Sequence, residues 1–168
     1  MKNLTTILLL FFIPTILIGQ NLKALDEKYG FREAKFEMPF DSFKNLVKNE
    51  KDFKDFYKST NEDLNLGEYV LDRVYYGFYK GQLATIIIKT KGYTNSRGVL
   101  SIFQQAYGKG YKINQIEEYI WSGKKVYMSY DQDSIITDDA TIFIFSVKLT
   151  DLEEADKKRA DSEAAKKL

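Results

Sequence analysis

Two β-rich runs that meet at Lys80-Gly81 constrain the fold more than any other stretch of the chain. The segment 69–91 (YVLDRVYYGFYKGQLATIIIKTK) is dense in Val, Ile, Tyr, Phe and Thr on both sides of this dipeptide. Gly81 can adopt the positive φ that a two-residue hairpin loop requires, and β-branched and aromatic residues favour strands. We therefore expect an antiparallel hairpin that turns at Lys80-Gly81.

The position of the turn predicts how the two strands pair. Counting outward from Lys80-Gly81 places Val74 opposite Ile87, and Asp72 opposite Lys89, where opposite charges would meet. Because side chains alternate between the faces of a strand, the other face carries Tyr75 and its neighbours. Both faces are partly apolar, so we expect helices on one of them. The other is either a second core layer or an aromatic surface.

Residues 1–20 have the composition of a cleaved secretory signal. Lys2 precedes an apolar run, Leu4 to Ile18, that is too short to cross a bilayer comfortably, and the small residue Gly19 suits a cleavage site. An uncleaved N-terminal anchor is the alternative. The chain has no Cys, which excludes acylation as a lipoprotein. We expect a periplasmic or secreted protein with no membrane span after cleavage.

The charges and the missing residue types exclude several function classes. Removal of residues 1–20 takes away only Lys2 among the charges, so the 25 basic residues become 24 and balance the 24 acidic ones. This balance argues against nucleic-acid binding. The absence of His and Cys excludes Ser-His-Asp and Cys-His catalysis and thiolate or imidazole metal sites. The chain carries no P-loop and no G-x-G-x-x-G motif, so we expect no cofactor.

The rest of the chain predicts further helices and strands. Residues 21–29 are either a short helix or a loose segment, and residues 51–59 are either helix or, from Phe53, strand. Residues 61–67 (NEDLNLG) have turn composition. The clearer elements are a strand at 31–36, an amphipathic helix at 39–48, a helix at 95–107 that ends at Gly108, a hairpin of 115–121 with 125–130, and a strand at 141–149 that is apolar on both faces.

Together these elements predict an α+β fold. We expect a single antiparallel sheet of six or seven strands with two helices packed on one face, because the order helix then three strands occurs twice. The single domain would span residues 21–149. A capping box at Thr150 and Glu153 would open a charged helical tail, 150–168, which is either a solvated helix or a partner-binding coil.

Two motifs carry a resemblance over most of the chain after residue 20. They are Val74 to Leu83 (VYYGFYKGQL) and the Tyr107-Gly108 helix end, followed by a Trp121-x-Gly123 hairpin and a closing apolar strand. Together they resemble a group of small secreted proteins of Gram-negative bacteria with no assigned activity. The layout is also similar to β-lactamase-inhibitor-like folds and to outer-membrane-assembly lipoproteins, although the lipobox Cys of the latter is missing. The resemblance concerns architecture and implies no catalytic residue.

The function that these observations favour is non-catalytic binding of a protein or another envelope component. Aromatic side chains are enriched at binding hot spots, so the candidate binding residues are Tyr75, Tyr79, Tyr119 and Trp121. The alternative is a carboxylate-dependent or Ca²⁺-linked hydrolase that uses the acidic loop of Asp131, Asp133, Asp138 and Asp139. We expect no metal there, because Ile135-Ile136 would hold the two acidic pairs apart.

Overall fold

The computed structural model describes residues 20–113 and 117–167 of the chain. Residues 1–19, which carry most of the predicted signal peptide, and residues 114–116, near the start of the predicted second hairpin, lie outside the described residues. The described residues form an α+β fold with one nine-stranded sheet, a separate two-stranded sheet and three α-helices. Within this part of the chain, no helix is long and apolar enough to cross a membrane.

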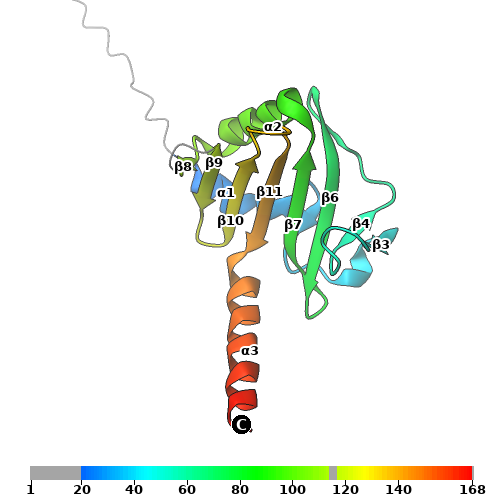
Figure 1. The fold of residues 1–168 in the computed structure, drawn as a ribbon, viewed down its shortest axis with the longest axis vertical. Helices are drawn as coiled ribbons and strands as arrows, with labels where there is room; N and C mark the ends of the chain where they lie inside the picture. The colour runs from blue at the N-terminus through cyan, green and yellow to red at the C-terminus, as the bar shows by residue number, and fades with distance from the viewer. Residues whose placement is uncertain (1–19, 114–116, 168) are drawn as a thin grey trace, which may run out of the picture.

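The main sheet is antiparallel throughout, and its central strands are the longest (Figure 1). Its order is β3 (Leu46–Lys48), β4 (Tyr57–Ser59), β6 (Tyr69–Tyr79), β7 (Gln82–Thr90), β11 (Ala140–Ser146), β10 (Val126–Gln132), β9 (Glu118–Ser122) and β8 (Tyr111–Lys112). A short strand, β5 (Asn65–Leu66), pairs with the start of β6. As its apolar sequence predicts, β11 lies inside the sheet, between β7 and β10.

The prediction of a single sheet of six or seven strands with two helices is wrong. Residues 39–48 form a 3-10 turn, η1 (Phe40–Ser42), followed by the edge strand β3, instead of an amphipathic helix. Asn45 has a φ of 59°, which an α-helix cannot accommodate. Residues 31–36 are also not one strand: β1 (Gly30–Phe31) and β2 (Ala34–Lys35) form a small separate hairpin.

One face of the main sheet, the core face, is covered by two helices. These are α1 (Leu22–Lys28), which begins after the capping side chain of Asn21, and α2 (Gly92–Tyr107), the predicted second helix with one more turn at its start. In Figure 1, α1 lies behind the sheet and α2 crosses one end of it. Helix and sheet side chains join in one buried cluster that includes Leu25, Leu71, Val74, Ile86, Ile88, Val99, Leu100, Phe103, Trp121, Met128, Ile142 and Ile144.

The predicted hairpin at Lys80-Gly81 is confirmed, but its pairing changes partway along. Tyr79 faces Gln82 and Phe78 faces Leu83, as expected. Beyond them, an extra residue in β7 forms a β-bulge, so that Val74 pairs with Ile88 instead of Ile87. The expected pairing of Asp72 with Lys89 is wrong for the same reason. Ile86 and Ile88 thereby face the core, together with Val74.

The second hairpin is shifted by two residues from its predicted pairing. Trp121 faces Met128 instead of Val126, because four residues, Gly123 to Val126, separate the first paired residues, Ser122 and Tyr127. A shift of two residues preserves the faces of a strand, whereas a shift of one reverses them. Trp121 therefore still points toward the core face.

The other face of the sheet, which we name the open face, carries no helix (Figure 1). Its central row runs across the strands through Tyr75, Ile87, Phe143, Ser129 and Ile120. The segment between β3 and β4 covers its β6 side: the ring of Phe53 lies 5.4 Å from that of Tyr75 and 6.2 Å from that of Phe143. Ile87 of β7 lies between these two residues and is 1% exposed, so the cover extends over β7, whereas the residues of β11, β10 and β9 on this face are half-buried or exposed.

A third helix, α3 (Val147–Ala165), follows β11 directly and projects beyond the sheet (Figure 1). Its N-cap is Ser146, whose hydroxyl accepts from the Leu149 backbone N–H, so the predicted capping box at Thr150 is wrong. Asp156 accepts hydrogen bonds from Tyr79 and Lys80 at the tip of the first hairpin. The charged tail is thus a helix, and Asp156 in its middle attaches it to the tip of the first hairpin.

Candidate functional site

The four aromatic residues predicted for binding do not form one surface. Tyr75 and Trp121 are 0% exposed, and they lie on opposite faces of the sheet. Tyr119 is buried beside Trp121 on the core face, with their ring centroids 6.4 Å apart. Tyr79 is half-buried at the hairpin tip, where it donates to Asp156. The expectation of a shared exposed surface is therefore wrong, and three of the four residues are not accessible to a partner.

The acidic loop uses its carboxylates to fix its own backbone. Asp133 accepts from the N–H groups of Ile135 and Ile136, and Asp139 accepts from the Gly92 N–H at 2.8 Å, at the start of α2. Among residues 20–113 and 117–167, no three acidic side chains come together as a metal site would need. Among the described residues, the acidic loop therefore offers no cluster of three acidic side chains for the Ca²⁺-linked alternative.

A hollow of about 360 Å³ opens beside β6, where three connecting segments meet. Small-molecule sites are usually concave, mostly apolar and of about 300–1,000 Å³, with a few well-placed polar groups. We name this hollow the Glu62 pocket. It is lined by Phe31, Arg32, Glu33, Ala34, Met38, Ser42, Phe43, Lys44, Leu46, Ser59, Asn61, Glu62, Asp63 and Tyr76.

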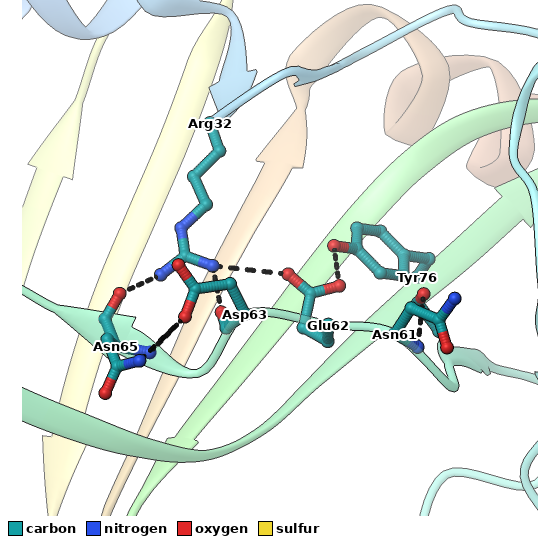
Figure 2. A network of polar contacts seen from close by, with 7 residues as sticks. Arg32, Asn61, Glu62, Asp63, Asn65 and Tyr76 are labelled. Atoms are coloured by element: carbon teal, nitrogen blue, oxygen red, sulfur yellow. Dashed lines mark hydrogen bonds and ion pairs between the residues drawn. The ribbon is translucent and has the colours of Figure 1, made fainter.

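The polar centre of the pocket is a carboxylate that receives two different donors. Tyr76 Oη donates to Glu62 Oε2 at 2.7 Å, and Arg32 Nη1 lies 3.4 Å from Glu62 Oε1 (Figure 2). The Glu62 side chain is 14% exposed. Tyr76 reaches the pocket from the middle of β6, so one partner of Glu62 is fixed by the sheet itself.

Arg32 is held in place by the turn that carries it and by the segment it contacts. It lies between β1 and β2 with a φ of 53°, a value that residues other than glycine seldom adopt and that occurs preferentially at functional sites. Its guanidinium also donates to the carbonyl oxygens of Asp63 and Asn65, as Figure 2 shows. The Phe31 ring lies 4.9 Å from the guanidinium carbon. Arg32 therefore joins the β1–β2 hairpin to the 61–66 segment.

A second hollow, of about 640 Å³, lies between α1 and the turn at 122–125. Its carboxylate, Asp26, accepts from three consecutive backbone N–H groups, those of Lys124, Lys125 and Val126, at 2.8–3.0 Å. Asp26 therefore uses three of its roughly four acceptor sites to fix the turn. The carboxylate of the Glu62 pocket receives only two hydrogen bonds and retains more acceptor capacity.

The pKa shifts in the Glu62 pocket indicate which side chains donate hydrogen bonds and which accept them. Burial, followed by the hydrogen bond to Glu62, raises the pKa of Tyr76 far above its ordinary value, so Tyr76 stays protonated and acts as a donor. The pKa of Asp63 is lowered chiefly by the hydrogen bond from the Asn65 backbone N–H. A carboxylate has about four lone-pair sites, of which Tyr76 and Arg32 occupy two on Glu62. Glu62 can therefore accept further hydrogen bonds from a ligand.

Sequence reasoning did not identify these residues. Glu62 lies in a stretch with the composition of an ordinary turn, and Arg32 lies in the 31–36 segment predicted as a strand. The two residues are separated by 30 positions, and no fixed spacing links them. The available signal was the acidic pair Glu62-Asp63 ahead of the hairpin strand that carries Tyr76.

The described fold is that of a known family. No curated protein and no solved structure matches the chain. The model of the TP0088 domain matches residues 29–160, a range that contains the whole main sheet and every residue of the Glu62 pocket. The prediction of membership in a family is confirmed at this level. The chain belongs to the TP0088 domain family.

Proposed function

We propose that this protein is a non-catalytic binding protein that takes a small ligand in the Glu62 pocket. The observation that carries the proposal is a largely buried carboxylate with unused acceptor sites in the wall of a partly apolar hollow. Buried charges are costly to a fold, so one that is only partly satisfied internally points to a further partner. The proposal keeps the non-catalytic role that the sequence favours and moves the site from the aromatic surface to this pocket.

The pocket favours a ligand with an apolar body and a head that donates hydrogen bonds. Phe31, Phe43 and Leu46 offer apolar walls, and Glu62 offers a negative acceptor. Glu33 and Asp63 add two carboxylates to the lining, against the cations of Arg32 and Lys44. Because Arg32 already donates to three oxygens, its charge is largely committed. A cationic head, such as an ammonium group, fits this arrangement better than an anionic one.

The protonation state of Tyr76 and the residue types of the chain support binding without catalysis. Tyr76, with its raised pKa, is not a general base near neutral pH. The chain contains neither His nor Cys, the residues that most often act as bases or nucleophiles. These properties support a pocket that orients a ligand by hydrogen bonds and charge.

Export is part of the same proposal. The composition of residues 1–20 supports cleavage near residue 20 and a periplasmic or secreted location, as in the resembling proteins of Gram-negative bacteria. The ligand would then be a small component of the envelope or its surroundings. N-terminal sequencing of the protein recovered from producing cells tests this part. A protein that retains Met1 in the cytoplasmic fraction would contradict it.

Paired probes with the same aromatic body test the proposed ligand chemistry. Phenethylamine presents an ammonium head and phenylacetate a carboxylate, and both can be titrated into isotope-labelled protein while amide chemical shifts are followed by NMR. We expect saturable shifts with phenethylamine that concentrate on residues of the Glu62 pocket, and little response to phenylacetate. The variant Glu62→Gln should weaken the phenethylamine response roughly tenfold, since a charge-assisted hydrogen bond contributes about 1.5–3 kcal/mol.

The matched control is Glu154→Gln on α3, which removes the same charge at an exposed site away from the pocket. It should leave the titration unchanged. Tighter binding of phenylacetate than of phenethylamine, or an equal loss of response in both variants, would refute the proposed ligand class. A complete lack of saturable shifts in the pocket with either probe would argue that Arg32, Glu62 and Tyr76 only join segments of the fold.

A further inference from the structure

The loop between β10 and β11 presents two aliphatic side chains to solvent. Ile135 is 90% exposed and Ile136 is 83% exposed, the highest values among the large apolar side chains of the described residues. A single exposed apolar side chain is ordinary on a protein surface, whereas a group of them marks contact with a partner or a membrane. The positions of the other exposed apolar side chains therefore decide what this pair means.

Strand pairing places two further exposed apolar side chains at the same end of the sheet. The last row shared by β6, β7, β11 and β10 at this end consists of Leu71, Thr90, Ala140 and Gln132. Val70 precedes this row on β6, Tyr93 follows it after β7, and the two isoleucines follow it after β10. Val70 is 49% exposed and Tyr93 is 62% exposed. Four of the seven exposed large apolar side chains among the described residues thus lie beyond this row.

The opposite end of the molecule is rich in charges instead. Its two turns carry Lys80 on one side and Lys124 and Lys125 on the other. The charged helix α3 also projects from that end, away from α2 and the loop after β10 (Figure 1). The two ends of the sheet therefore differ in the kind of surface that they present.

The backbone of the isoleucine loop is satisfied within the loop itself. Asp133 Oδ1 accepts from the N–H groups of Ile135 and Ile136 at 3.3 and 3.2 Å, and the Asp133 carbonyl accepts from the Asp138 N–H at 2.7 Å. An unpaired backbone N–H is costly to move from water into an apolar medium. The two isoleucines can therefore leave water without carrying unpaired N–H groups with them.

We propose that the apolar end, which consists of Val70, Tyr93, Ile135 and Ile136, docks on the surface of an uncharged, zwitterionic lipid bilayer. Ile135 and Ile136 enter the boundary between headgroups and acyl chains, where the free energy of transfer grows with the apolar area removed from water. Tyr93 suits the headgroup level, where tyrosine is enriched in membrane proteins. α3 then points away from the bilayer. This contact uses no residue that lines the Glu62 pocket.

The spacing of these side chains favours a lipid surface over a protein partner. They stand on separate connections, and a polar hollow of about 330 Å³ lies between the start of α2 and the isoleucine loop. Its lining consists of Tyr93, Arg97, Glu117, Gln132, Ser134 and Asp138. A stable protein interface needs closely packed contact over about 800 Å² per partner. Lipid headgroups and water can adapt to separate points of insertion, so the interrupted surface is suited to a bilayer.

The charge of the loop selects the type of headgroup. Residues 131–139 contain no basic side chain and four acidic ones, namely Asp131, Asp133, Asp138 and Asp139. Asp131 and Asp138 take part in no ion pair found among the described residues. Lys89 and Lys91, at the end of β7, balance these charges only in part. Anionic headgroups would therefore be repelled, and the bilayer that fits this end is uncharged.

Vesicle flotation tests the proposal with protein recovered from producing cells, its N-terminus verified by sequencing. We expect the protein to float with phosphatidylcholine vesicles, and the partition coefficient to fall at least roughly tenfold in the double variant Ile135→Ser, Ile136→Ser. Leu152→Ser on α3 is the matched control, since Leu152 is 40% exposed at the charged end, and it should leave partition unchanged. Vesicles containing phosphatidylglycerol should bind the parent protein less well.

A reporter in the loop shows which part of the chain meets the lipid. The chain contains no Cys, so Ile136→Cys and Leu152→Cys can each carry a single nitrobenzoxadiazole dye. Phosphatidylcholine vesicles should shift the emission of the dye at position 136 to the blue and leave that at position 152 unchanged. If sequencing shows that the apolar residues 1–20 are retained, this reporter decides in place of flotation.

The substitutions should not affect folding, because both isoleucines are already exposed. Thermal unfolding of the double serine variant should have the midpoint of the parent protein. A processed parent protein that ignores phosphatidylcholine vesicles, a double variant that floats equally well, or a preference for anionic vesicles overturns the proposal. Sedimentation equilibrium adds one more such outcome: self-association that the double variant loses, without vesicle binding, would assign the apolar end to a protein contact.

Discussion

The core face and the open face are built from alternate residues of the same strands, yet they differ in what covers them. The core face meets two helices, and its side chains form a single sealed cluster with Leu25 and Phe103. The open face is covered only over β6 and β7, mainly by Phe53 and Phe56 from one connecting segment. The difference shows that equal apolar content in a strand does not imply equal burial, because the covering element comes from elsewhere in the chain.

The largest effect that can test this comparison is a matched pair of phenylalanine truncations. Phe103→Ala on α2 leaves a cavity in the core face and should lower the free energy of unfolding by about 3–5 kcal/mol. Phe53→Ala uncovers the β6 side of the open face and should lower it by only about 1–2 kcal/mol, since its ring is half-buried. Urea denaturation with a common m-value measures both. Equal losses would show that the open face contributes as much as the core face.

A buried charge gives the next test. Val74 is 2% exposed on the core face, so Val74→Asp should lower the free energy of unfolding by at least about 3 kcal/mol. Val70 lies on the same strand and is 49% exposed, so Val70→Asp should change it by less than about 0.5 kcal/mol. Thermal unfolding of the two variants compares them directly. An unchanged thermal unfolding midpoint for Val74→Asp would mean that water reaches the core face at this position.

The smallest expected effect concerns the attachment of α1 to the edge of the core face. Burial of Asp26 raises the pKa of its carboxyl, but hydrogen bonds from the Lys125, Lys124 and Val126 backbone N–H groups outweigh this, and the net pKa is lowered from 3.8. Since the folded pKa is depressed, the stabilisation is present above the unfolded value and is lost as the pH falls through the folded value. Asp26→Asn should cost about 1 kcal/mol at neutral pH.

The pH dependence of that effect is its own control. The difference in unfolding free energy between Asp26→Asn and the parent chain should shrink as the pH is lowered below about 3.8. Chemical denaturation at a series of pH values measures it. A difference that stays constant down to strongly acidic pH would mean that the carboxylate charge does not stabilise the turn.

Local patterns in the sequence predicted the elements whose contacts are local. The turn at Lys80-Gly81 and the helix that ends at Gly108 depend on neighbouring residues, and both are confirmed. The bulge in β7 has no such signal, because an extra residue near Ala84 looks like any other residue of a strand. Its effect on pairing was therefore missed from Gly77 to Arg73, and a second bulge at Asp72 returns Leu71 to its expected partner, Thr90.

Segments whose structure depends on distant partners were predicted poorly. The apolar spacing of Phe40, Phe43 and Leu46 suits a helix, but pairing with β4 makes residues 46–48 an edge strand. The Glu62 pocket has the same origin, since Arg32, Glu62 and Tyr76 meet only after three segments are assembled. A single sequence provides no information about such a meeting, whereas it does reveal periodicity and turn residues.

The bonds between Asp26 and the turn at 123–125 also bear on the order in which the chain folds. Asp26 and Val126 are separated by 100 positions, so the contact closes nearly the longest loop in the domain. During synthesis, α1 leaves the ribosome long before its binding turn exists, whereas β6 and β7 can pair as soon as residue 90 has emerged. The first helix to be made is thus among the last elements to be fixed. Contacts between α1 and α2 can form earlier, but the bonds from Asp26 that fix this helix to the turn at 123–125 can form only when β9 and β10 are in place.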